Sequence, residues 1–162
     1  AGVFICLQLL EKFDVIKGFF PVAEETGCHG SRGAKEDFFK DVGYAIQFDS
    51  TENDTMSLSL MGTQLFEQDS EFFNKTKGLI LEHGFTEWRH HPYTDTMVLK
   101  ERFNFACLNF AAGYYNYHTD NEYVIVEDVL NSTLLGESVI KELGNEFYEF
   151  KVPKKGSFGW FD

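Results

Sequence analysis

The sequence predicts an α/β fold built as one layered domain, and three observations support this prediction. Short apolar runs typical of buried strands alternate along the chain with segments whose apolar residues recur at helical spacing. The length of 162 residues fits a single domain. Aromatic residues make up 17% of the chain, which is typical of a packed core, and no repeat or low-complexity block interrupts the pattern.

The first two expected elements lead into a pair of acidic residues. Residues 1–13 have Val3, Leu7 and Leu10 at helical spacing, but no capping residue precedes them, so the chain is expected to begin inside an element. Residues 18–23 read as a buried strand, and Glu24 and Glu25 follow it directly. Ionised carboxylates are costly to desolvate without a partner, so a functional site is the natural reason to place them there.

The middle of the chain continues the alternation. Residues 35–40 predict a short helix, and residues 44–48 predict a strand that ends at Asp49. An amphipathic helix is expected over residues 70–83, capped by Asp69 or Ser70 and stopped by a glycine.

The last third contains a short strand at 85–90, a helix from Thr94 or Asp95 to about residue 102, and an apolar strand at 103–110. A brief extended stretch at 123–126 precedes the final helix, which ends at Gly144. Its expected core-facing residues are Val126, Val129, Leu130, Leu134 and Ile140.

Composition excludes several classes of function. The 26 acidic and 14 basic residues give a net charge of −12, which opposes binding to nucleic acid or to an anionic membrane. No apolar span is long enough to cross a membrane. Cys6, Cys28 and Cys107 show no metal-binding or disulfide spacing, so we expect a reducing compartment and a cytoplasmic protein.

Residues with catalytic or metal-binding chemistry follow three of the expected strands: Glu24 and Glu25, then Asp49, then His118. Carboxylates and imidazoles are ligands for zinc and similar divalent ions, and a free carboxylate can act as a base. Each residue also has a simpler interpretation: the acidic pair as a solvated loop, Asp49 as a turn cap, and His118 as a surface histidine.

Other residues of these types are weaker candidates. The adjacent His90 and His91 are expected to point to opposite faces of a strand, which favours separate packing or solvated roles. Tyr114, Tyr115 and Tyr117 can either line a specificity pocket or pack in the core or at its rim.

Taken together, these segments resemble a known family. The run from Val22 to Ser31 resembles the Glu-Glu-x-Gly-x-x-Gly-Ser signature of co-catalytic zinc aminopeptidases and related di- and tripeptidases. Phe48-Asp49 resembles the next metal-ligand strand of that family, Tyr93-Thr94-Asp95 its Thr-Asp turn, and the stretch around His118 its closing His-Ser/Thr-x-x-Glu segment. The resemblance implies a three-layer helix/sheet/helix fold with a mixed, mostly parallel central sheet.

The resemblance also implies a role for each residue in the hydrolysis of peptide bonds. Glu24 would be the general base that takes a proton from a metal-bridging water. Two Zn²⁺ ions, or other divalent metals, would occupy a complete site. The implied metal ligands are Glu25 and His118 for one ion and Asp49 for the other, and the implied substrate-side residues are Thr94, Asp95, Tyr114 and Tyr115.

The sequence departs from the family in one respect. The family also needs a His-x-Asp motif and a bridging Asp, which we expect upstream of Ala1. Residues 1–144 would then be the C-terminal portion of a single lidless catalytic domain, truncated at its N-terminal side, and residues 145–162 a tail.

This chain alone is accordingly expected to be inactive, with a partner segment or subunit covering the truncated sheet edge. The alternative is a non-catalytic structural or interaction protein that retains the peptidase fold.

Overall fold

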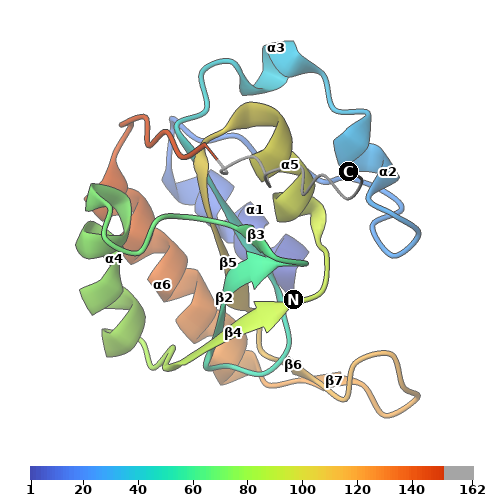
Figure 1. Ribbon diagram of the computed structural model, residues 1–162. Helices are drawn as coiled ribbons and strands as arrows, with labels where there is room; N and C mark the ends of the chain where they lie inside the picture. Colours follow the sequence, from blue (N-terminus) through green and yellow to red (C-terminus); the bar gives the residue numbers. More distant parts are fainter. Residues whose placement is uncertain (152–162) are drawn as a thin grey trace, which may run out of the picture.

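A mixed five-stranded sheet forms the centre of the computed structural model, which describes residues 1–151 (Figure 1). Strand β1 (Tyr44–Ser50) pairs in parallel with β5 (Ala106–Ala111). Strand β2 (Thr55–Leu60) pairs antiparallel with β5 and with β3 (Thr63–Gln64), and in parallel with β4 (Glu87–His91). The strand order is β1-β5-β2-β3, with β4 also on β2. The predicted α/β fold with a mixed sheet is confirmed.

Three long helices pack together against one face of this sheet. They are α1 (Gly2–Lys12), α4 (Glu71–Glu82) and α6 (Val126–Leu143). A Cβ atom on Gly136 of α6 would lie 2.9 Å from Phe48 Cζ and 3.0 Å from Leu9 Cδ1. The missing side chain therefore lets α6, β1 and α1 meet at close range.

The other face is covered by α5 (Asp95–Phe103), whose Thr96 amide donates a hydrogen bond to Gln47 Oε1 at 3.0 Å. Two short helices, α2 (His29–Arg32) and α3 (Glu36–Phe39), precede β1. The guanidinium of Arg102 on α5 donates to the carbonyl oxygens of residues 31 and 34, both at 2.7 Å. These bonds fix the segment that follows the acidic pair onto α5.

Local sequence signals explain several helix ends. The Ser70 hydroxyl accepts a hydrogen bond from the Phe73 amide at 3.3 Å, which makes Ser70 the N-cap of α4 as predicted. Gly144 ends α6 with a positive φ of 58°, also as predicted.

Two predicted features are wrong. Residues 18–23 form no strand, because no neighbouring strand offers them a ladder of hydrogen bonds within the described chain. Val126, Leu130 and Leu134 of α6 are exposed at 61%, 47% and 51%. Helix α6 is apolar on several faces, and the face that contains Val129 turns inward instead.

The remaining described elements complete the fold. Strands β6 (Tyr114–Tyr115) and β7 (Tyr123–Val124) form a hairpin that extends from the body (Figure 1). Helix α1 buries Ile5 and Leu9, whereas Val3 and Leu7 are exposed. Within residues 1–151, none of the helices combines the length and the apolar character needed to cross a bilayer.

Candidate functional site

The turn that holds Glu24 and Glu25 has an unusual backbone. Ala23, directly before the acidic pair, has a positive φ of 57°, a conformation that costs energy for a residue with a side chain. A Cβ atom on Gly30 would lie 2.5 Å from the backbone nitrogen of Val22, so only glycine fits there. The glycine of the motif thus folds the chain back on itself and holds both carboxylates at the surface of the turn.

Asp49 reaches the same region through an irregularity in β1. The β1–β5 register shifts between Phe48 and Ser50, which leaves Asp49 as the extra, unpaired residue of a bulge. Gln47 holds its carboxylate, because Gln47 Nε2 donates to Asp49 Oδ2 at 3.1 Å. Thr94 Oγ1 in turn donates to Gln47 Oε1 at 2.9 Å. The bulge therefore turns Asp49 out of the sheet, and Gln47 connects it to the start of α5.

His118 lies in the loop of the β6–β7 hairpin and reaches the acidic turn. Its backbone nitrogen donates to Glu122 Oε2 at 3.1 Å, which stabilises its left-handed φ of 60°. Its Nε2 atom lies 3.1 Å from Glu25 Oε1, although 93 positions separate the two residues in the chain. The structure thus brings together the two residues predicted to ligate one metal.

Asp95 lies beneath this cluster rather than at its surface. Only 7% of the residue is exposed, and the Ser31 hydroxyl donates to Asp95 Oδ1 at 2.5 Å. Burial raises the pKa of Asp95, while hydrogen bonds from Ser31 and Cys28 oppose this rise. Thr94 is equally buried at 7%. Asp95 and Thr94 are therefore buried residues that hold the surrounding chain in place through their hydrogen bonds to Ser31 and Gln47.

The cluster carboxylates influence one another's protonation. Partial burial, followed by the charges of Asp49, Glu25 and Asp95, raises the pKa of Glu24 to about 7, and His118 opposes this rise. Loss of surrounding water, then the charges of Asp95 and Glu25, raises the pKa of Asp49 to about 6, although the residue is exposed by area. Glu24 is therefore the carboxyl group suited to exchange protons near neutral pH.

The donor set fits a divalent ion only in part. The Glu25 carboxylate and the His118 imidazole face each other with 71% and 63% of their side chains exposed. They are chemically suited to zinc, but a protein zinc site normally has at least three protein ligands. Among residues 1–151, no three histidine, cysteine, aspartate or glutamate side chains are arranged to hold one ion.

The two tyrosines predicted on the substrate side occupy different surroundings. The Tyr114 hydroxyl donates to the backbone oxygen of Asp49 at 3.3 Å, so this side chain borders the cluster. The Tyr115 hydroxyl donates to Asp128 Oδ2 at 2.5 Å, and its ring stacks on Tyr123. Tyr115 therefore packs against α6 and the opposite strand of the hairpin.

The adjacent histidines His90 and His91 are bound separately and away from the cluster. Each ring has its Nδ1 atom 2.7 Å from a serine hydroxyl of β2, Ser59 for His90 and Ser57 for His91. Within the described chain, the two histidines are not part of a group of three residues that could bind one metal ion.

Sequence reasoning missed Gln47, which connects Asp49 to α5. Its one signal was a polar residue inside an otherwise apolar strand.

Comparison with models of known protein families gave no match to the chain, and comparison with curated proteins gave none either.

Proposed function

We propose that this chain is part of a metal-dependent peptide hydrolase of the co-catalytic zinc aminopeptidase type, acting on peptides as an aminopeptidase or small-peptide hydrolase. The observation that carries the proposal is the contact between Glu25 and His118, at 3.1 Å. Both residues belong to motifs of the resembled family, and nothing in their separation along the chain requires them to meet. The proposal extends to the fold: helices on both faces of a mixed sheet agree with the three-layer zinc-peptidase arrangement.

In this proposal each side chain has a distinct task. Glu25 and His118 would hold one divalent ion and Asp49 a second, and a bound ion would supply Lewis acidity toward a peptide carbonyl. Glu24 would accept and return a proton at its carboxylate, for which a pKa of about 7 is well suited. Tyr114 would border the bound peptide, and Thr94 and Asp95 would keep the ligands in place.

We further propose that this chain contains only part of the metal site. Because the described residues lack a three-ligand group, this chain by itself would bind zinc weakly and hydrolyse peptides slowly or not at all. The remaining ligands would come from polypeptide outside this sequence. Three free cysteines in the described residues are consistent with the cytoplasmic location that we propose.

The same lack of a third ligand favours a second candidate function. A protein that retains the fold without a complete metal site would act as a non-catalytic structural or interaction component. The two candidates differ in whether a longer polypeptide that carries the missing ligands has activity.

Hydrolysis of amino-acid anilides with added Zn²⁺ tests the proposal, comparing this chain with a version extended upstream. We expect activity in the extended form, and we expect Glu24→Gln to abolish it while zinc content, measured by atomic absorption, is retained. Glu25→Gln and His118→Gln should instead weaken zinc binding by about tenfold or more. Inactivity of both the short and the extended chain would exclude the enzyme and leave the interaction protein.

A further inference from the structure

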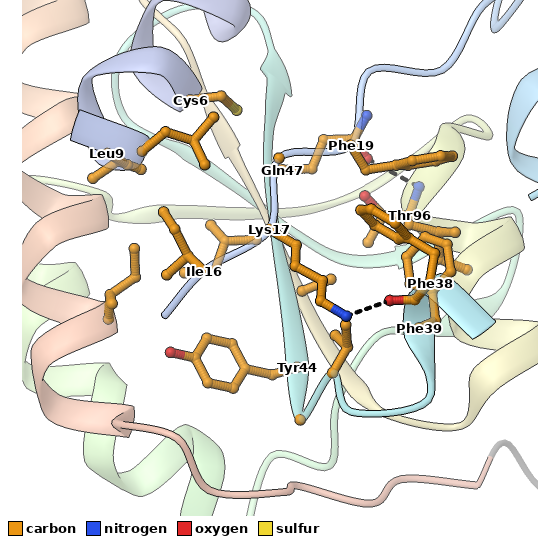
Figure 2. A pocket seen from close by; sticks show the side chains of 18 of the residues that line it. Cys6, Leu9, Ile16, Lys17, Phe19, Phe38, Phe39, Tyr44, Gln47 and Thr96 are labelled. Atoms are coloured by element: carbon orange, nitrogen blue, oxygen red, sulfur yellow. Dashed lines mark hydrogen bonds between the residues drawn. The ribbon is translucent and has the colours of Figure 1, made fainter. Parts of the chain in front are cut away.

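A cavity of about 290 Å³ lies along the outer edge of β1 and borders the candidate site at Gln47 and Asp95 (Figure 2). All residues from 43 to 48 line one side of it, and the segment at residues 15–19 together with Pro21 lines another. Its walls are mostly apolar and largely aromatic. The wall side chains that matter here are Ile16, Phe19, Phe38, Phe39 and Leu99.

The edge of β1 at this cavity lacks a partner strand. Within the described chain, β1 pairs only with β5. In a parallel pair, every second residue of a strand directs its N–H and C=O groups away from its neighbour. The cavity therefore exposes a row of backbone donors and acceptors between apolar walls, which is the arrangement that accepts an additional strand.

The opposite wall can yield to such a strand. Residues 15–19 belong to no strand, so no ladder of hydrogen bonds fixes them against β1. A polar anchor of this wall is Lys17, whose Nζ donates to the Phe38 carbonyl at 2.8 Å (Figure 2). The same Nζ pairs with Asp41. Moving this segment outward would break the contacts of Phe19 with Phe38 and Phe39, but no ladder of backbone hydrogen bonds.

We propose that this cavity, the β1 groove, binds an extended apolar segment of another polypeptide, which adds to β1 as a strand. Alternate side chains of the added strand would face the aromatic wall and the interior. The pairing uses backbone groups and apolar contact, so it depends on neither a metal nor the hydrolytic activity proposed above.

The charges around the groove define the partner further. Lys17 is engaged with Asp41, and Glu146 lies near one end of β1. The position of Glu146 follows from its backbone oxygen, which lies 2.0 Å from where a Cβ of Gly43 would be. With a net charge of −12, the protein favours a partner strand flanked by lysine or arginine.

Fluorescence anisotropy with a labelled synthetic peptide tests this inference on the full chain. The probe has alternating valine and phenylalanine residues between lysine pairs. A second peptide has glutamate pairs instead, and a third has N-methylated backbone at alternate positions. We expect saturable binding of the first peptide, binding about tenfold weaker for the glutamate version, and loss of binding on N-methylation.

Two variants, each of which replaces an apolar side chain by arginine, show where the peptide binds. Phe38→Arg places a cation on the groove wall and should weaken binding by about tenfold. Leu134→Arg makes the same change at an exposed apolar residue of α6 outside the groove and should leave binding within about twofold. Equal effects of both variants, or no binding of any peptide, would overturn the proposal.

The C-terminal segment of the chain is the competing occupant, since it contains Lys154, Lys155 and Trp160. Replacing Phe158, Trp160 and Phe161 by serine in the full chain distinguishes the two. Unchanged peptide binding supports a partner in trans. Peptide binding that appears only after this replacement would show that the groove belongs to the chain's own end, and would overturn our assignment.

Discussion

At the scale of single residues, Glu24 differs from its neighbour Glu25 in the surroundings that determine its pKa. Glu24 and Glu25 are adjacent and identical, but Glu24 is more buried, and this burial together with the charges of Asp49, Glu25 and Asp95 raises its pKa to about 7. Glu25 is turned outward, where its carboxylate meets His118. The fold thereby gives two consecutive glutamates different surroundings.

Glu24→Gln should change how stability depends on pH. The pKa of Glu24 is higher in the folded state than its ordinary value of 4.5, so the folded state favours the protonated form. Its contribution to stability is therefore present below pH 4.5 and is lost as pH rises through about 7. Glutamine stays neutral, so the Tm of the variant should exceed that of the wild type at pH 8 and approach it at pH 5.

Differential scanning calorimetry from pH 5 to pH 8 measures this difference, with Glu82→Gln at the exposed end of α4 as the matched control. The control should follow the wild type throughout. A Glu24→Gln variant with the same pH profile as the wild type would show that the Glu24 carboxyl is not perturbed.

Helix α5 is the element on which the candidate site depends most. Its N-terminal turn supplies Asp95 and the Thr94 contact to Gln47, and its C-terminal turn supplies Arg102. One helix therefore contacts both the turn after the acidic pair and the strand that holds Asp49. Loosening α5 would move both halves of the cluster relative to each other.

Replacing Arg102 by Met should destabilise the protein by about 2–3 kcal/mol, because three backbone carbonyls would lose a charged donor. Urea unfolding measures the effect. Arg89→Met is the control, since the Arg89 side chain is 48% exposed and its ion pairs within residues 1–151 are with exposed glutamates. It should cost less than about 1 kcal/mol. Equal losses in both variants would mean that Arg102 does not hold the turn.

Two helical glycines should respond in opposite directions to a larger side chain. Gly136 lies against Phe48 and Leu9, so Gly136→Leu should destabilise the protein by about 2 kcal/mol through overpacking. Gly78 of α4 has no atom within 4 Å of its ideal Cβ position. Gly78→Ala should therefore stabilise the helix by about 0.5–1 kcal/mol. Thermal and urea unfolding of both variants measure these changes. An increase in the stability of Gly136→Leu would contradict the close packing of α6 on the sheet.

At the scale of the whole molecule, local signals were predictable and long-range ones were not. The α4 helix follows from its Ser70 cap and its amphipathic spacing, both of which are local. The face of α6 does not, because the helix carries apolar residues around most of its surface and only packing on α1 and α4 selects Val129 over Leu130. Residues 18–23 have a strand-like composition, but a strand also needs a neighbour.

In the candidate site, too, local features could be predicted from the sequence and long-range ones could not. Glu24, Glu25, Asp49 and His118 could be selected from motifs and strand ends, since those are patterns within short stretches. The bulge that exposes Asp49 and the link through Gln47 depend on the register between β1 and β5 and on the docking of α5. No single sequence reveals that register.

We propose that the Glu24–Glu25 turn, Asp49 and His118 form one metal-binding region, with Glu25 and His118 on one divalent ion and Asp49 on a second. Titration of the isotopically labelled chain with Mn²⁺, followed by paramagnetic broadening of its backbone amide signals, tests this most directly. We expect the amides of Glu25, Ser50 and His118 to broaden first, and we expect a Glu25→Gln/His118→Gln double variant to lose this selectivity. Broadening spread evenly over the acidic surface, or unchanged in the double variant, would contradict the claim.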